Sequence, residues 1–271
     1  MAVLQEIFKR FDRMENVMRD FAQKVASLQV PEGTVGVCFL GQAGFAFKTP
    51  DNQLIAIDPY LSNCCERYFG FKRLMPYILD ANDLIFDQII ASHAHFDHFD
   101  PDSIPVMMAN GYTEFIGALD TKAECERLGI HENITFLACG ETLERGTVKI
   151  TGVPCDHGKD TPYALGLLLK IAGKRIYIMG DTAYRPDYLE NPLLQGVDLL
   201  ILPINGAFGN LNEEQAAKVV EELSPELAVP CHYWNFAEHG GNPGLFQQKM
   251  KELAPEKVYR LMQQGEMMLL I

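Results

Sequence analysis

The sequence contains no apolar run that approaches the roughly 20 residues of a membrane-spanning helix. It is also poor in positive charge: 23 Lys and Arg stand against 36 Asp and Glu, which gives a formal net charge of −13. A nucleic acid or an anionic membrane would repel such a surface. We therefore expect neither a nucleic-acid partner nor a membrane partner for this chain.

Three further features are missing. No secretory segment is visible, because charged residues interrupt the apolar residues near the N-terminus. The seven cysteines are odd in number and lack the spacing of a disulfide framework, so we expect a reduced, cytoplasmic setting. No Gly-x-Ser-x-Gly motif indicates a serine nucleophile.

The first 30 residues show an amphipathic helical pattern. Apolar residues recur three or four positions apart between Leu4 and Leu28, with charged residues between them. The pattern predicts an N-terminal helix over residues 1–30 that packs on a domain formed by residues 31–271. A contact between two copies of the chain, and hence a homo-oligomer, is the alternative use of this helix.

Residues 31–271 alternate between strand-like and helix-like segments, and no Ser-rich linker divides them. Helices are expected near 101–110, 120–129, 212–223 and 243–253. Two strand-rich series with helices after their strands predict one layered α/β domain. The expected strands lie at 34–40, 44–49, 53–58, 87–92, 113–117, 134–137, 146–153, 163–171, 174–180, 197–203, 226–231, 257–261 and 266–271.

Histidine is concentrated in one short stretch. The segment 92–100 reads "SHAHFDHFD" and holds three of the seven histidines, directly after an apolar strand-like run. Alternate side chains of an extended chain point the same way, so His93 and His95 can bind one ion together. Asp97 and His98 lie just past the strand and can face a second ion. Imidazole and carboxylate suit zinc, manganese or iron.

Three more metal-binding side chains end apolar runs. His157 follows one strand-like segment in "GVPCDHG", Asp181 follows a second in "YIMGDTAY", and His232 follows a third in "AVPCHYW". Together with the first cluster they supply five histidines and two aspartates at four strand ends. This set is large enough for two metal ions.

In its motifs the chain resembles the metallo-β-lactamase superfamily: "IDPY", "SHAHFDH", "CDHG", "GDT" and "CHYW" occur in that family's order. The resemblance implies an αββα sandwich with a metal site along one edge, to which the N-terminal helix is added. It implies that Asp181 bridges the two ions and that Asp58 orients a ligand from behind. The implied ligands are His93, His95 and His157 at one ion, and Asp97, His98 and His232 at the other.

Within the superfamily the chain looks most like the L-ascorbate-6-phosphate lactonase (UlaG-like) branch. "FLGQAGFAFKT", "GDTAYRPDY" and "PCHYWNFAEHGGNP" carry this likeness. It implies a hydrolase in which metal-bound hydroxide attacks a sugar-phosphate lactone or a related ester. Two divalent ions, manganese or zinc and alternatively iron, would activate the water. Asp97 and Asp181, as ligands, are also placed to take or relay protons.

The expected substrate is small and anionic, and phosphorylated in the lactonase reading. Lys159 and Arg185 follow the ligands His157 and Asp181 closely and can meet a phosphate, while a Gly-rich loop carries His239 as a donor. For His239 the alternative is a role in stabilising its loop. The segment 66–74 interleaves basic and aromatic residues and is either a cover over the substrate or an exposed face.

Two other activities fit the same ligands. One is a metal-dependent phosphodiesterase. The other is a di-iron redox protein, but that branch usually has Glu between the first two histidines, where this chain has Ala94. A metal-stabilised scaffold without catalysis is a third reading, and the full ligand set argues against it.

Overall fold

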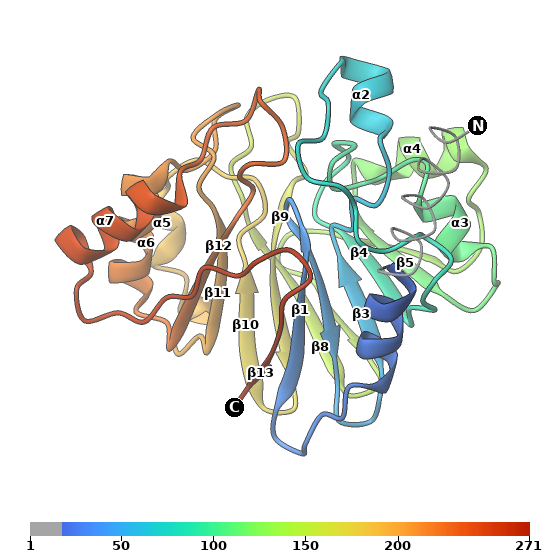
Figure 1. Ribbon diagram of the computed structural model, residues 1–271, viewed down its shortest axis with the longest axis horizontal. Coiled ribbons are helices and arrows are strands. Elements are labelled where there is room, and N and C mark those ends of the chain that lie inside the picture. The colour runs from blue at the N-terminus through green and yellow to red at the C-terminus, as the bar shows by residue number, and fades with distance from the viewer. Residues whose placement is uncertain (1–17) are drawn as a thin grey trace, which may run out of the picture.

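The computed structural model describes residues 18–271 as two β-sheets packed face to face, with helices on both outer faces (Figure 1). The seven-stranded sheet has the order β13-β1-β2-β3-β4-β5-β6, and the six-stranded sheet has the order β12-β11-β10-β9-β8-β7. The first sheet contains β1 Val35–Gly41, β2 Gly44–Lys48, β3 Leu54–Ile57, β4 Gln88–Ala91, β5 Glu114–Ala118, β6 Ile134–Leu137 and β13 Met267–Leu270. The second contains β7 Thr142–Arg145, β8 Val148–Pro154, β9 Leu165–Ile171, β10 Lys174–Ile178, β11 Leu199–Pro203 and β12 Leu227–Cys231.

Alternate side chains from both sheets fill the space between them. Val35, Val37 and Phe39 of β1 belong to the same buried cluster as Leu165 and Leu167 of β9. Successive side chains of a strand point to opposite faces, and here the intervening residues are buried beneath the outer helices. Most strands are therefore apolar on both faces, as strands in the middle layers of a four-layer fold must be.

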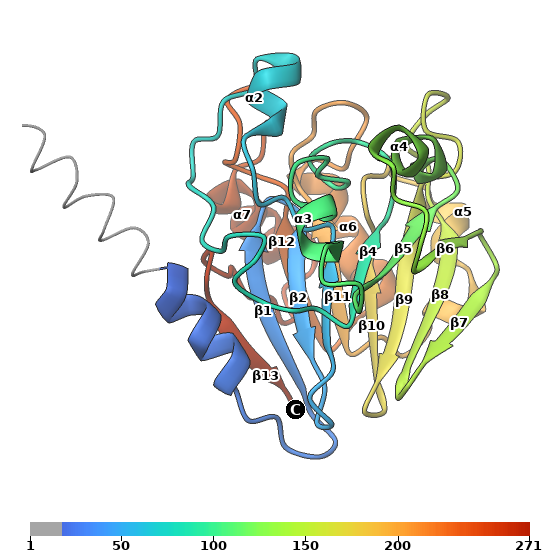
Figure 2. The same cartoon turned by 90° about the vertical axis from the view of Figure 1, so that its right-hand side faces the viewer.

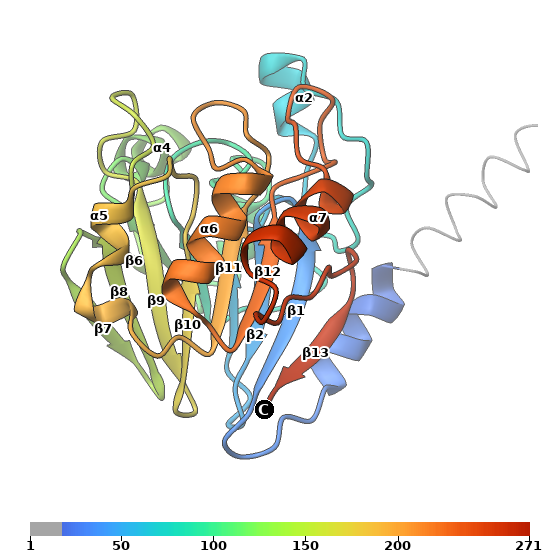
Figure 3. The same ribbon diagram turned by 90° about the vertical axis from the view of Figure 1, so that its left-hand side faces the viewer.

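The helices form the two outer layers. The seven-stranded sheet is covered by a helix at residues 18–27, by α3 Ile104–Met108 and by α4 Thr121–Leu128 (Figure 2). The six-stranded sheet is covered by α5 Pro186–Leu189, α6 Glu213–Leu223 and α7 Pro243–Leu253, and a short 3-10 turn lies at Pro192–Leu194 (Figure 3). α2 Cys64–Phe69 stands above one edge of the sandwich (Figure 1).

The predicted α/β sandwich with an N-terminal helix is confirmed. In the helix at 18–27, Phe21, Ala22 and Val25 are buried against the seven-stranded sheet, and the part of the predicted helix before residue 18 lies outside the described residues. The sequence patterns missed α2, β7 and α5. The expected strand at 257–261 is wrong: this segment makes one isolated bridge, from Tyr259 to Ala228, and no ladder.

The strands direct their carboxyl ends to a common edge. β3 pairs with β4 in parallel, and β10, β11 and β12 are mutually parallel. β8 runs antiparallel to β9, which runs antiparallel to β10, so β8 has the direction of β10. At this edge the Leu165 amide donates to the Ser92 carbonyl at 3.0 Å and ties the two sheets together. Polar residues that follow these strands therefore meet.

The expectations about membrane-spanning segments and disulfides concern the helices and the cysteines. Across residues 18–271 no helix combines the length and apolarity needed to cross a bilayer. All seven cysteines are free thiols, and five of them are buried.

Candidate metal centre

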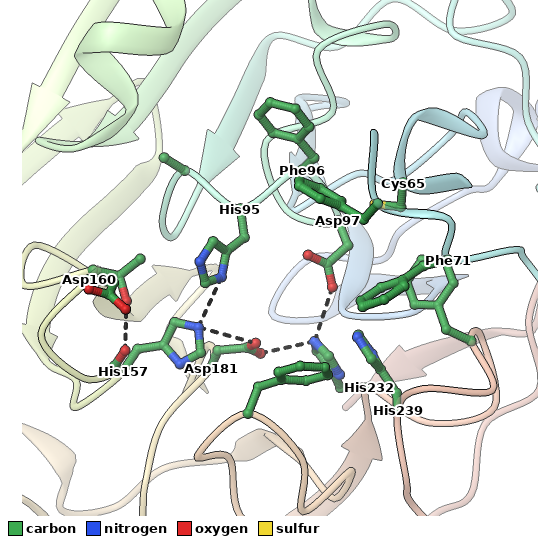
Figure 4. A pocket seen from close by; sticks show the side chains of 15 residues that line it. Cys65, Phe71, His95, Phe96, Asp97, His157, Asp160, Asp181, His232 and His239 are labelled. Atoms are coloured by element: carbon green, nitrogen blue, oxygen red, sulfur yellow. Dashed lines mark hydrogen bonds and ion pairs between the residues drawn. The ribbon is translucent and has the colours of Figure 1, made fainter. Parts of the chain in front are cut away.

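The loop after β4 presents four side chains of types that can bind a metal ion. The backbone turns sharply there, because the amides of His98 and Phe99 both donate to the His95 carbonyl, at 2.9 and 2.7 Å. His93 and His98 are fully buried, whereas His95 and Asp97 face the cavity above the sheet edge (Figure 4). Because of this turn, one short loop contributes side chains to two adjacent clusters of possible metal ligands.

The first cluster consists of His93, His95 and His157. Nε2 of His93 lies 3.1 Å from Nδ1 of His95, which lies 3.0 Å from Nε2 of His157. One ring nitrogen of each histidine thus points at a common centre, with all three atoms within 4.8 Å of one another. Oδ2 of Asp181 lies 3.7 Å from Nε2 of His157 and provides a fourth donor.

The second cluster consists of Asp97, His98 and His232 and shares Asp181 with the first. Oδ1 of Asp181 lies 3.1 Å from Nε2 of His232 and 3.3 Å from Nε2 of His98. Oδ2 of Asp97 lies 3.4 and 3.8 Å from the same two nitrogens. The Asp181 carboxylate therefore faces one cluster with each oxygen. We call the seven residues of both clusters the metal cradle.

These separations fit metal ions. Four donors placed about 2.0–2.2 Å from a tetrahedral ion lie roughly 3.3–3.6 Å from one another, and the second cluster spans 3.1 to 3.8 Å. Oδ1 of Asp181 is buried and makes no hydrogen bond of good geometry, although Nε2 of His232 and Nε2 of His98 lie 3.1 and 3.3 Å from it. A buried carboxylate oxygen without a hydrogen bond is costly unless a cation compensates it. The donor set, imidazole and carboxylate, suits zinc, manganese or iron.

Asp58 holds the ligand loop from behind. Its Oδ1 accepts from the Ser92 amide at 2.7 Å, and its Oδ2 accepts from the Ser92 hydroxyl at 2.7 Å and lies 2.8 Å from Nδ1 of His98. In the neutral imidazole, a bond from Nδ1–H of His98 to Asp58 leaves Nε2 without a proton and directed at the second cluster. Asp58 adopts φ 46°, an uncommon conformation for a non-glycine residue that is found at functional sites.

Two other backbone features bring ligands into the cradle. Gly180 precedes Asp181 with φ 65°, and a Cβ there would lie 2.9 Å from the Leu165 carbonyl oxygen, so the turn requires glycine. His232 has φ 61°, and its amide donates to the Gln42 carbonyl at 2.8 Å. The β10 and β12 ends thus carry their ligands on strained or glycine-dependent turns.

Burial opposes charge throughout the cradle, yet opposite charges dominate in its second cluster. Burial lowers the pKa of His232, but Asp181 and Asp97 outweigh it and raise that pKa to about 9. Asp181 and Asp58 likewise raise the pKa of His98 well above its usual value against the effect of burial. Burial and the neighbouring His98 hold the pKa of His93 well below its usual value.

The pKa of the Asp181 carboxyl is shifted downward. Burial favours a neutral Asp181, but His232 and His98 hold its pKa well below the usual range. The pKa of His157 is also lowered, to about 4, because burial outweighs the attraction of Asp181. Without metal, the cradle therefore combines ionised carboxylates with protonated His98 and His232, and a bound cation would displace those protons.

A cavity of 610 Å³ opens directly onto the cradle, a size that admits a small molecule. Five phenylalanines line it beside His95, Asp97, His157, Asp181 and His232. We call these five rings the aromatic wall; they are Phe69, Phe71, Phe96, Phe208 and Phe236.

The structure places one of the three expected substrate contacts in this cavity. His239 lines it, and its ring stacks on His232 with centroids 4.8 Å apart. Lys159 is exposed and lies outside the lining. Arg185 also lies outside it, because its guanidinium binds Asp156 at 2.8 Å and Asp187 at 2.6 Å. Neither Lys159 nor Arg185 lines the cavity in this structure, and their contact with a phosphate stays a prediction.

Sequence patterns did not reveal Gln42 or Ser92. The Gln42 amide nitrogen donates to Oδ2 of Asp97 at 2.8 Å and lies 3.2 Å from Nε2 of His232 and 3.3 Å from Nδ1 of His239. Gln42 lies in the turn between β1 and β2, far from every histidine in the sequence, so no local spacing indicated its role. Ser92 directly precedes His93 and resembles an ordinary strand-end serine.

Comparisons with known proteins agree with this geometry. The Beta-lactamase superfamily domain matches residues 36–232. A UPF0173 metal-dependent hydrolase of Rubrobacter xylanophilus is 31% identical over 245 residues, which cover 86% of this chain and 96% of the relative.

Two solved structures share the fold. Igni18, described as a novel metallo hydrolase from the archaeon Ignicoccus hospitalis, has a TM-score of 0.68 at 24% identity and covers 87% of this chain and 98% of its own. The metallo-beta-lactamase fold protein YhfI from Bacillus subtilis has a TM-score of 0.67 at 17% identity, with coverages of 88% and 100%.

Proposed function

Because this chain belongs to the metallo-β-lactamase superfamily, and within it to the UPF0173 metal-dependent hydrolase family, we propose that it is a hydrolase that acts through two divalent ions. The observation that carries this proposal is the Asp181 carboxylate, whose two oxygens face two separate groups of imidazole nitrogens. Single-ion sites have no need of such a shared ligand. Manganese or zinc, with iron as the alternative, suits the donors.

Bound in the cradle, two divalent ions would lower the pKa of a water molecule toward neutrality and polarise a carbonyl oxygen of the substrate. The protein contributes position and proton transfer. Asp97 faces the cavity, and its carboxylate is oriented by the Gln42 amide. It is therefore placed to accept a proton from the attacking water.

His239 is placed to assist the leaving group. Burial, with a smaller contribution from His232, lowers the pKa of His239 to about 4, so its imidazole is neutral at physiological pH. A neutral imidazole has one N–H that can donate to an oxygen in the cavity. In the net reaction water adds across an acyl C–O bond of an ester or lactone and gives a carboxylic acid and an alcohol.

The experiment is elemental analysis of purified protein, combined with a hydrolysis screen over lactones, phosphodiesters and thioesters. We expect two ions per chain and turnover of carbonyl esters or lactones. Asp181→Asn should retain at most one ion and lose turnover. The matched control is Asp198→Asn, since Asp198 accepts from the Arg175 amide at the opposite end of the sheet.

Two ions and full turnover in the Asp181→Asn protein would contradict the shared-ligand mechanism. Turnover of phosphodiesters alone would favour the phosphodiesterase alternative. Equal loss of metal in the Asp198→Asn protein would show that the effect reflects stability and not ligation.

A further inference from the structure

The aromatic wall is assembled from segments far apart in the sequence. Phe69 ends α2, Phe71 follows it, Phe96 lies in the ligand loop, and Phe208 and Phe236 follow β11 and β12. Phe69 contacts Phe96 with ring centroids 5.5 Å apart, and Phe71 contacts Phe208 and Phe236 at 6.0 Å each. Phe69 also contacts Phe71, with ring centroids 6.2 Å apart, so the five rings form one connected surface; Figure 4 shows Phe71 and Phe96 beside the cradle.

Two of these five rings are largely exposed to solvent. Phe69 is 56% exposed and Phe208 is 61% exposed, although both are large and apolar. Phe208 also adopts φ 53°, an uncommon conformation for a bulky residue. Exposed apolar side chains gathered at a cavity, with backbone strain among them, are typical of a binding surface.

Two arginines of the segment 66–74 make contacts outside this surface, whereas Arg127 of α4 lies over Phe96, with its guanidinium carbon 5.6 Å from the ring centroid, and is paired with Glu124. Arg67 binds Asp102 at 2.6 Å. Arg73 stacks on Tyr60 with its guanidinium carbon 4.4 Å from the ring centroid, and it donates to the Tyr60 and Ser62 carbonyls. The segment 66–74, which was expected either to cover an anionic substrate or to be solvated, thus contributes its phenylalanines to the cavity and not these two arginines.

The cavity lining as described contains neither Lys nor Arg. Its charged residue outside the cradle is Asp160, which is negative. A phosphate group needs charge-assisted donors, and without them its transfer from water onto aromatic rings is unfavourable. The part of the substrate that lies beyond the ions is therefore apolar.

Building on the proposed hydrolase function, we infer that the substrate is an uncharged ester or lactone with an aromatic or bulky alkyl group that packs on the aromatic wall. Its carbonyl group lies at the cradle. Water oxygen bonds to the carbonyl carbon, the C–O bond to the alcohol breaks, and a proton goes to the departing alkoxide. The products are the apolar carboxylic acid and its alcohol, joined in one molecule when the substrate is a lactone.

The test compares neutral lactones that differ in one group, γ-phenyl-γ-butyrolactone and γ-methyl-γ-butyrolactone, with 6-phosphogluconolactone as the anionic probe. We expect kcat/KM for the phenyl lactone to exceed that for the methyl lactone at least about tenfold, the scale of discrimination in an apolar pocket. Phe71→Ala should reduce this ratio toward one. In the control Tyr112→Ala, an exposed aromatic residue outside the cavity, the ratio should persist.

A binding measurement separates this inference from the hydrolase proposal. Calorimetry on metal-stripped protein with γ-phenyl- and γ-methyl-butyrolactam, which resist hydrolysis, should show at least about tenfold tighter binding of the phenyl compound. Phe71→Ala should abolish the difference. Selective lactam binding without turnover of any lactone, ester, thioester or phosphodiester would support the aromatic wall and overturn the hydrolase proposal.

Equal kcat/KM for the phenyl and methyl lactones, or a preference for 6-phosphogluconolactone, would overturn the inferred substrate class while leaving hydrolysis intact. Unselective lactam binding would overturn it as well.

Discussion

The metal cradle and the aromatic wall adjoin the same cavity but are held in opposite ways. His93 and His98 of the cradle are fully buried, follow a sheet strand and are fixed by hydrogen bonds to Asp58 and Ser92. The wall comes from loops and from the end of one short helix, and Phe208 stands mostly in solvent. In the proposed function, side chains at the sheet edge would hold the metal ions and side chains on the loops would contact the substrate.

The largest expected effect follows from removal of cradle ligands. The His93→Ala/His95→Ala double variant should lose at least one of the two ions, because the first cluster retains only His157 and one Asp181 oxygen. Turnover should disappear with the metal. Elemental analysis checks this result against His131→Ala, which alters an exposed histidine outside the cradle. Two retained ions in the double variant would contradict the assignment.

The next effect concerns a residue that touches no ion. Asp58→Asn should weaken metal binding about 10- to 100-fold, because His98 loses the carboxylate that orients it. Titration with a competing chelator measures the affinity. Asp87→Asn is the matched control, since Asp87 accepts from the Leu54 amide at the other end of β4. An unchanged affinity in Asp58→Asn would show that the loop orients His98 without it.

The cradle could be predicted from the sequence because each ligand ends an apolar run. Parallel strands bring their carboxyl ends to one edge, so His157, Asp181 and His232 could be grouped with "SHAHFDH" without knowledge of the connections between them. The alternation of strand-like and helix-like segments predicted one layered α/β domain, and the resemblance to the metallo-β-lactamase superfamily implied the αββα sandwich. Neither could indicate Gln42, whose approach to Asp97 depends on how the β1–β2 turn lies across the edge.

Like the position of Gln42, the aromatic wall could not be predicted, because it depends on how the loops fold in space. Phe69, Phe96 and Phe236 belong to separate segments with no common spacing, and only the folded loops bring their rings together. The sequence does not show which way Arg73 points, so it left two uses of the segment 66–74 open. Nor does it show that the Arg185 guanidinium donates to Asp156 and Asp187.

A smaller effect is expected in how the stability and the metal affinity of the cradle depend on pH. In metal-free protein the protonated His232, with its pKa raised to about 9, contributes stability that is complete below its ordinary pKa of about 6.5 and is lost as pH rises toward 9. Metal must displace this proton, so its affinity should rise up to about tenfold per pH unit below 9 for each proton released.

The metal-induced increase in Tm should therefore widen from pH 6.5 to pH 9, as measured by thermal unfolding with and without manganese. At a free metal concentration of 100 Kd, metal binding adds about 2.7 kcal/mol to the free energy of unfolding. An increase that stays constant with pH would show that metal displaces no proton from the cradle.

The smallest expected effect concerns the stability of the wall. Phe69→Ala should change the free energy of unfolding by about 0.5 kcal/mol or less, because the ring is mostly exposed. Phe115→Ala, in the buried core, should cost about 3–5 kcal/mol. Denaturant unfolding measures both. A large loss in Phe69→Ala would mean that the wall supports the fold and is not reserved for binding.

The central claim is that Asp181 joins two ions in one centre. Electron paramagnetic resonance of the protein loaded with two equivalents of Mn²⁺ tests it most directly, since ions bridged by one carboxylate couple magnetically. We predict an exchange-coupled spectrum in the wild-type protein and a spectrum of isolated Mn²⁺ in Asp181→Asn. A wild-type spectrum of isolated Mn²⁺ at full loading would contradict the account.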